Sequence, residues 1–224
     1  MSKEPDIEYK RFILSLIPPA VLLFFIWLVF IYQVADGADL YFFGIFPRRF
    51  SGLIGILTCP FIHANFSHLI NNTVPFFFLL TAIFYFYHDV AWRVILYSWL
   101  VTGVLVWLLA RPSYHVGVSG QIYCFASFLF FSGIVRKNIN LLSISLLVIF
   151  VYGSMVWGIF PYRPDMSFES HLMGLLVGAV LAVHYRHEGP QPTVFMKDMA
   201  EEEDEDGDPE MDDNESSEKL IDKN

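Results

Sequence analysis

The sequence contains only two cysteines, Cys59 and Cys124, among its 224 residues. Two cysteines are too few for a disulfide-stapled secreted domain, and they do not form a CxxC metal motif. No HExxH sequence occurs either, which excludes the helical zinc site of many metalloproteases. Long polar stretches are also lacking before residue 188, where polar residues interrupt the apolar blocks only briefly. An ordinary soluble domain is therefore excluded.

Apolar residues dominate the chain instead. They occupy 55% of the positions, Phe alone occurs 23 times, and the mean hydropathy is +0.49. A helix needs about 20 residues to cross the hydrocarbon core. Six apolar segments approach that length, namely 12–33, 67–87, 90–110, 117–135, 141–160 and 168–185. The sequence predicts an all-α membrane protein, in which residues 1–187 form a bundle of six transmembrane helices.

The charge is divided unevenly along the chain. Residues 188–224 hold fifteen acidic and three basic side chains, whereas residues 1–187 hold eight acidic and eleven basic ones. A segment so acidic and so poor in apolar residues cannot bury enough surface to fold. We expect residues 188–224 to be a disordered acidic tail, and a regulatory or partner-binding role for it stays open.

Basic residues near the ends of the spans predict the orientation in the membrane. Seven basic residues lie before the first span, in the even-numbered loops or after the last span, and four lie in the opposite loops. The seven are Lys3, Lys10, Arg11, Arg93, Arg136, Lys137 and Arg186, and the four are Arg48, Arg49, Arg111 and Arg163. This balance favours both termini in the cytoplasm.

Polar residues inside membrane spans are costly and often functional, and here they gather at three helix starts. The groups are His63, His68, Asn71 and Asn72; His115, Ser119 and Tyr123; and Glu169, Ser170 and His171. Because helices alternate in direction, the second, fourth and sixth spans begin on the same side of the membrane. At about 1.5 Å per residue, the three groups lie at a similar shallow depth. The sequence predicts one site that opens toward the non-cytoplasmic face.

A GxSG sequence occupies residues 117–120, at the start of the fourth span. Alone, this short motif also fits a helix start that uses Gly and Ser for capping and packing. A serine hydroxyl needs an adjacent imidazole to take its proton, and His171 is the best-placed candidate. Gly174 and Gly178 share a helix face with His171 and have the small-xxx-small spacing that lets helices approach closely. We predict Ser119 as the nucleophile and His171 as the base.

An acyl-transfer reaction also needs hydrogen-bond donors for the oxyanion of its tetrahedral intermediate. His68 and Asn72 are spaced i, i+4 and share a helix face, so both can reach one point. The backbone N–H of Ser119, near a helix N-terminus, can be a third donor. The other interpretation of His68 and Asn72 is that they form polar contacts between helices of the bundle.

Three stretches together resemble the rhomboid intramembrane serine proteases. They are residues 58–72 (TCPFIHANFSHLINN), 117–123 (GVSGQIY) and 171–178 (HLMGLLVG). Their order, spacing and span assignment match the family over residues 10–187. The resemblance implies a serine endopeptidase that hydrolyses peptide bonds in or near the transmembrane segments of protein substrates within the lipid bilayer.

The resemblance also implies roles for individual residues. It implies a Ser119–His171 dyad without an acidic third member, and an oxyanion site formed by His68, Asn72 and the Ser119 amide. Tyr123 would pack against the His171 ring, and His63 would take part in local hydrogen bonding. The small residues that we expect to support this arrangement by close packing are Gly117, Gly120, Gly174 and Gly178.

Several positions depart from the family pattern. Many relatives carry a Trp-Arg pair in the first loop, where this chain has only Arg48-Arg49-Phe50. Cys124 and Ser127 replace residues that are often glycine. These changes concern substrate preference and helix spacing rather than the dyad.

Two other functions stay open from the sequence. The first is a catalytically silent rhomboid-like protein that binds and steers membrane clients, although this chain keeps both the serine and the histidine. The second is a metal-dependent enzyme or transporter, whose candidate ligands would be His63, His68, His115 and His171, although the nearby carboxylates Asp165 and Glu169 lie in or beside a loop. We expect no cofactor, no metal and no nucleic-acid partner, and the oligomeric state stays open.

Overall fold

The structure is a computed structural model that describes residues 4–151, 157–161 and 166–190. Its longer helices are α1 (Glu4–Asp36), α3 (Phe66–Phe86), α4 (Ala91–Leu109), α5 (Ser119–Val135), α6 (Ile139–Val151) and α8 (Phe168–His184). Short helical turns fill the connection between α1 and α3, namely η1 (Tyr41–Phe43), η2 (Phe50–Leu53), α2 (Gly55–Thr58) and η3 (Cys59–Phe61). The described residues contain no strand beyond an isolated bridge between Ile45 and His115. The all-α prediction is confirmed.

Each of the six predicted segments overlaps one of the longer helices. Three helical stretches are long and apolar enough to cross a membrane, namely Ile7–Asp36, Phe66–Phe86 and Ala91–Leu109. The apolar helices α5, α6 and α8 are shorter, at 17, 13 and 17 residues. The fifth predicted segment extends to residue 160, and its residues 152–156 lie outside the described part of the chain.

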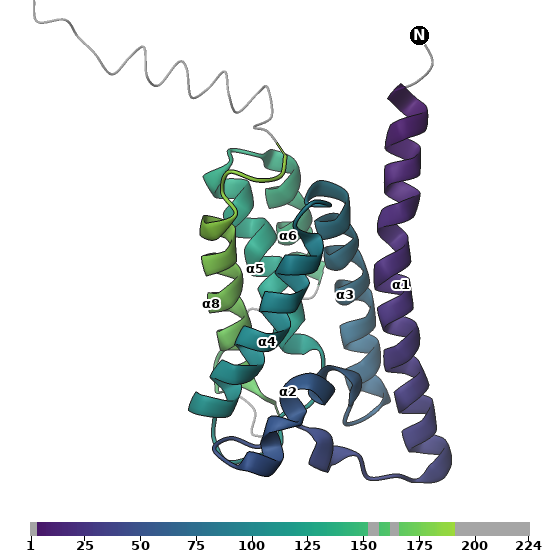
Figure 1. Cartoon of the computed structure of the whole chain (residues 1–224), viewed down its shortest axis with the longest axis vertical. Helices are drawn as coiled ribbons and strands as arrows, with labels where there is room; N and C mark the ends of the chain where they lie inside the picture. The colour runs from purple at the N-terminus through teal and green to yellow at the C-terminus, as the bar shows by residue number, and fades with distance from the viewer. Residues whose placement is uncertain (1–3, 152–156, 162–165, 191–224) are drawn as a thin grey trace, which may run out of the picture.

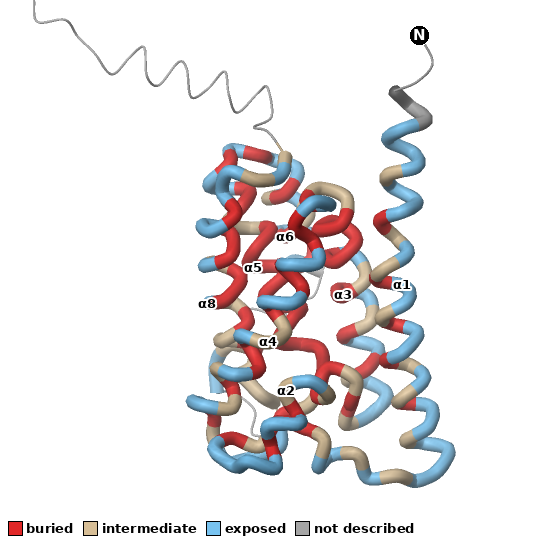
Figure 2. The backbone as a smooth tube through the Cα atoms, in the orientation of Figure 1, coloured by how far each residue is buried: buried red, intermediate tan, exposed pale blue. Residues whose placement is uncertain are grey.

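The helices run alternately up and down, with α1 at the edge of the bundle and α5 inside it (Figure 1). α1 contacts α3, whereas α5 contacts α3, α4, α6 and α8. Residues 119–129 of α5 are all buried, while large apolar side chains such as Phe24, Phe78 and Val180 lie exposed on outer helices (Figure 2). Exposed apolar side chains around an all-helical bundle suit a lipid solvent. The two ends of the described chain lie at the same end of the bundle.

Two glycines bring α8 against α5. A Cβ atom at Gly174 would lie 2.0 Å from the carbonyl oxygen of Gly120, and one at Gly178 would lie 2.2 Å from that of Cys124. No larger residue fits there without moving the backbone. The Ser127 hydroxyl also donates to the carbonyl oxygen of Leu175 over 2.7 Å. The small-residue face predicted from the sequence is therefore the surface on which the two helices meet.

The predicted acidic tail falls almost entirely outside the described residues. Its first residues, 188–190, lie against the bundle, because Arg136 donates a hydrogen bond of 3.0 Å to the carbonyl oxygen of Pro190. Glu188 pairs with Arg93 at 3.4 Å.

Candidate active site

Ser119 is the first residue of α5 and is only 7% exposed. The chain turns into this helix at Gly117, whose φ of +103° is a conformation that glycine adopts at little cost. The Gly117 amide donates to the carbonyl oxygen of Cys59 over 2.9 Å, which ties the turn to the connection between α1 and α3. The first N–H groups of a helix have no partner within it. Ser119 therefore sits where free amides and the positive end of the helix dipole meet.

His171 and Ser119 are joined across the α5–α8 contact. The Nε2 atom of His171 lies 2.9 Å from the Oγ atom of Ser119. His171 is the fourth residue of α8 and is 6% exposed. The two residues are 52 positions apart in the sequence, and the structure brings them within the range of a nucleophile–base hydrogen bond.

The other nitrogen of His171 faces a main-chain carbonyl. Its Nδ1 atom lies 2.8 Å from the carbonyl oxygen of Gly158. Because a carbonyl oxygen only accepts, the Nδ1 atom must carry the proton in the neutral ring. The Nε2 atom is then an acceptor, and the Ser119 hydroxyl donates to it. This tautomer allows the imidazole to take the serine proton.

Tyr123 stacks on the imidazole ring. The rings of Tyr123 and His171 lie 4.2 Å apart and are nearly parallel, at 9°. A Cβ atom at Gly158 would lie 2.0 Å from the Tyr123 hydroxyl and 3.0 Å from the Nδ1 atom of His171. Gly158 thus leaves room for the tyrosine while its carbonyl holds the histidine.

Asn72 and His63 form a buried pair at one side of the site. The Nδ2 atom of Asn72 lies 3.1 Å from the Nε2 atom of His63, so the amide donates to the ring. Burial lowers the pKa of His63 to about 3, which keeps the ring neutral and able to accept. An amide group carries two N–H donors, so this bond uses one and fixes the direction of the other.

His68 and Asn72 lie beside the turn that leads to Ser119. A Cβ atom at Gly117 would lie 2.8 Å from the Nε2 atom of His68 and 3.5 Å from the Nδ2 atom of Asn72. The missing side chain at Gly117 therefore lets both groups approach the chain two residues before Ser119. Asn65 caps this end of α3 by accepting from the His68 amide over 2.9 Å.

His115 occupies a different place. Its Nδ1 atom lies 2.5 Å from the Oγ atom of Ser167, which caps the N-terminus of α8. Within the described residues, no group of three or more His, Cys, Asp or Glu side chains could hold a metal ion. Asp165, one of the two carboxylates near these histidines in the sequence, lies outside the described part of the chain.

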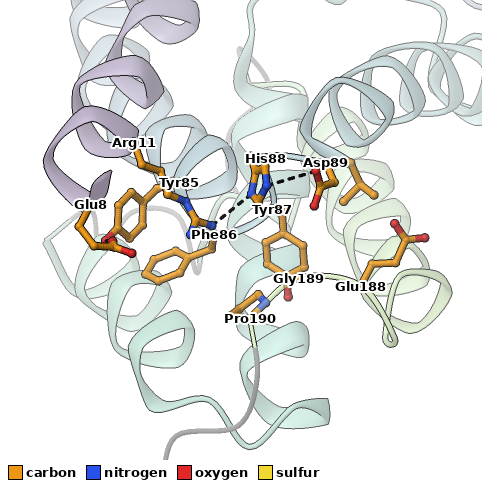
Figure 3. A pocket seen from close by; sticks show the side chains of 11 residues that line it. Glu8, Arg11, Tyr85, Phe86, Tyr87, His88, Asp89, Glu188, Gly189 and Pro190 are labelled. Atoms are coloured by element: carbon orange, nitrogen blue, oxygen red, sulfur yellow. Dashed lines mark hydrogen bonds and ion pairs between the residues drawn. The ribbon is translucent and has the colours of Figure 1, made fainter. Parts of the chain in front are cut away.

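A cleft of about 540 Å³ lies at the far end of the bundle and is lined by residues of α1, the C-terminal end of α3, the α3–α4 connection and residues 188–190 (Figure 3). Five of its polar side chains are paired with one another. Tyr85 donates to Glu8 over 2.6 Å, and His88 bridges Arg11 and Asp89 at 3.2 Å each. Tyr85 follows His68 by 17 residues on α3, which is about 25 Å along the helix. The cleft is therefore separate from the site around Ser119.

The role of Gly158 could not be predicted from the sequence. Its role depends on a main-chain carbonyl, which every residue has, and on space for Tyr123. The single glycine between Trp157 and Ile159, within an apolar stretch, is the only feature of the sequence that marks it.

Comparisons with known proteins place these residues in a family context. A family model described as the Rhomboid domain matches residues 51–188. The chain is 33% identical over 177 residues to two uncharacterized proteins, Mb1372 of Mycobacterium bovis and Rv1337 of Mycobacterium tuberculosis, covering 72% of this chain and 72% of each relative. It is 28% identical over 197 residues to the uncharacterized protein ML1171 of Mycobacterium leprae, covering 80% of this chain and 76% of the relative. Residues 51–188, which the family model matches, contain all the residues described around Ser119 and His171.

Proposed function

The chain belongs to the rhomboid family, and from this premise we propose that it is an intramembrane serine endopeptidase. The proposal is carried by one observation: the Ser119 hydroxyl is hydrogen-bonded through His171 to the Gly158 carbonyl at the start of α5, where the His68 and Asn72 side chains approach Gly117. That arrangement activates a hydroxyl as a nucleophile without an acidic third residue. For a multi-pass membrane protein of the rhomboid family, this pair is best explained as the catalytic pair of an enzyme that hydrolyses peptide bonds.

The proposed reaction follows from the atoms at the site. The Ser119 Oγ atom attacks the substrate carbonyl carbon while its proton passes to the Nε2 atom of His171. The resulting oxyanion accepts hydrogen bonds from His68, Asn72 and the Ser119 amide. His171 then gives its proton to the leaving amine, which leaves an acyl-enzyme. A water molecule, deprotonated by His171, hydrolyses the acyl-enzyme and restores the serine.

The arrangement in the membrane is part of the proposal. We infer that α1, α3, α4, α5, α6 and α8 are six spans of one domain, residues 1–187. Residues 188–224 would follow as a cytoplasmic tail, whose predicted disorder concerns residues 191–224, outside the described part of the chain. The basic residues favour both termini in the cytoplasm, and the site at the starts of α3, α5 and α8 would then open toward the non-cytoplasmic side.

The proposed substrates are membrane proteins with a single transmembrane segment. A helical segment hides its carbonyl groups in intrahelical hydrogen bonds, so it must unwind locally before Ser119 can attack. Cleavage is therefore expected in or near the membrane, at sequences where a helix opens easily.

Activity-probe labelling tests nucleophile and base together. The purified full-length protein in detergent is treated with a fluorescent fluorophosphonate. We expect labelling of the wild type and its loss in Ser119→Ala and in His171→Ala. The control is Ser98→Ala, which removes another buried hydroxyl, one that donates only to Ile95 within its own helix. Equal labelling of all four proteins would refute the proposal, and a wild type that never labels or cleaves would support a catalytically silent client-binding protein.

A further inference from the structure

A second serine–histidine pair lies at the start of α8. His115 accepts at its Nδ1 atom from the Ser167 hydroxyl over 2.5 Å, and its Nε2 atom lies 3.1 Å from the carbonyl oxygen of Arg111. Because that carbonyl only accepts, the Nε2 atom carries the proton and the Nδ1 atom is the acceptor. Ser170 lies 2.7 Å from Ser167, oxygen to oxygen, and donates its own hydroxyl proton because the Ser167 proton is already engaged.

Each member of this pair precedes a member of the first pair by the same number of residues. His115 precedes Ser119 by four residues, and Ser167 precedes His171 by four residues. The hydrogen bond between His115 and Ser167 therefore joins the two chain segments that lead into α5 and α8, just before the proposed dyad.

Further contacts connect the same two segments. Arg111 donates to the carbonyl oxygen of Met166 over 2.6 Å and pairs with Glu169 at 3.4 Å. The main chain of His115 is held in turn by Ile45, with both N–H···O bonds of the bridge at 2.9 and 3.0 Å. Residues 111–115 are thus held by the connection between α1 and α3, and they bind residues 166–169 through hydrogen bonds and an ion pair.

The packing of α8 against α5 does not by itself fix the starts of the two helices. Gly174 and Gly178 let α5 and α8 approach closely, and the hydrogen bond from Ser127 to Leu175 joins the two helices eight residues beyond Ser119. A displacement of about 1 Å between reacting groups can cost on the order of 10²-fold in rate. The starts of both helices therefore need a separate restraint.

We propose that the His115–Ser167 hydrogen bond, supported by Arg111, is a clamp that sets the position of α8 along α5 and so holds His171 against Ser119. The inference rests on the proposed function. His115 and Ser167 are positioning residues that touch the chain leading to the dyad and not the reacting atoms.

The test compares variants that remove one hydrogen bond from either end. His115→Leu and Ser167→Ala should each lower kcat for cleavage of a single-span substrate by about 10–10²-fold, with little change in KM. The double variant should be no slower than the worse single variant, because both remove the same bond. His115→Asn, which keeps an acceptor near the Nδ1 position, and Ser167→Thr, which keeps a hydroxyl, should recover most of the rate. Ser98→Ala is the matched control.

A second readout does not depend on activity. In protein labelled with ¹⁵N-histidine, Ser167→Ala should shift the NMR resonances of the His171 ring, whereas Ser98→Ala should leave them unchanged. An unchanged His171 ring in Ser167→Ala would overturn the clamp, as would full activity of both single variants. If the wild type neither labels nor cleaves, while Ser167→Ala still shifts the His171 ring resonances, the proposed function is refuted and the clamp stands.

Discussion

Within the part of the chain that the structure describes, two serine–histidine pairs lie within a few residues of each other in the sequence and share most of their local geometry. In each pair the serine hydroxyl donates to one ring nitrogen, and the other ring nitrogen donates to a main-chain carbonyl, that of Gly158 or that of Arg111. The pairs differ in the nitrogen used. Ser119 donates to the Nε2 atom of His171, whereas Ser167 donates to the Nδ1 atom of His115.

The surroundings differ more than the pairs themselves. His68 and Asn72 approach the chain at Gly117, two residues before Ser119, and Tyr123 stacks on the His171 ring. Ser167 instead caps a helix and accepts from Ser170. A hydrogen bond between serine and histidine therefore does not identify a nucleophile by itself. Both rings are held in one tautomer. The proposed oxyanion donors His68 and Asn72, and the tyrosine stacked on His171, therefore distinguish the proposed site for chemistry from the structural contact.

The largest effect should come from exchanging the two serines for alanine in turn. Ser119→Ala should lower cleavage of a single-span substrate by at least about 10⁴-fold, because the nucleophile is lost. Ser167→Ala should retain measurable cleavage. Mass spectrometry of the fluorophosphonate-labelled protein should place the label on the peptide with Ser119. A label on the peptide with Ser167 would reverse the comparison.

The Ser119–His171 pair was predictable because its signals lie in side chains. A serine and a histidine at the starts of two spans that begin on the same side of the membrane are visible in the sequence. The second pair was not predictable as a pair, since Ser167 is a polar residue at a helix start and His115 had several candidate roles. The role of Gly158 could not be predicted, because it depends on a main-chain carbonyl and on the absence of a side chain where the Tyr123 hydroxyl lies.

The oxyanion donors should give the next largest effect. Asn72→Ala should lower kcat by about 10²–10³-fold, which is the usual cost of removing one such donor, with little change in KM. Fluorophosphonate labelling should persist more than cleavage does, because Ser119 and His171 stay in place. A KM effect with unchanged kcat would show that Asn72 binds substrate or supports packing instead.

A substitution at Gly158 should affect the first pair alone, because Gly158 contacts both His171 and the tyrosine that stacks on it. Gly158→Ala should lower kcat by about 10²-fold, because the new methyl group would lie 2.0 Å from the Tyr123 hydroxyl and must displace it or the ring of His171. Tyr123→Phe in the same chain removes that oxygen and should restore part of the rate. Equal rates for Gly158→Ala with and without Tyr123→Phe would exclude this account of the loss.

The smallest predicted effect concerns His63, the buried partner of Asn72. Its pKa is lowered by burial to about 3 in the folded protein, against about 6.5 in an unfolded chain. As the pH falls below 6.5, the unfolded chain binds a proton that the folded site refuses, so the stability that the neutral ring contributes is lost as the pH falls. Between pH 7.5 and 5.0 this loss amounts to about 2 kcal/mol for one such histidine.

His63→Gln removes the titrating group but keeps an oxygen that can accept from Asn72. The free energy of unfolding in detergent, measured at pH 7.5 and 5.0, should therefore fall less in His63→Gln than in the wild type. Ser98→Ala should keep the wild-type slope, because it removes a hydroxyl that does not titrate. An equal slope in His63→Gln and the wild type would mean that His63 has the same pKa in the folded and the unfolded protein, so that its ring is protonated at pH 5.0. Its ring could not then accept from Asn72, and the amide would lose the bond that directs its second N–H toward the site.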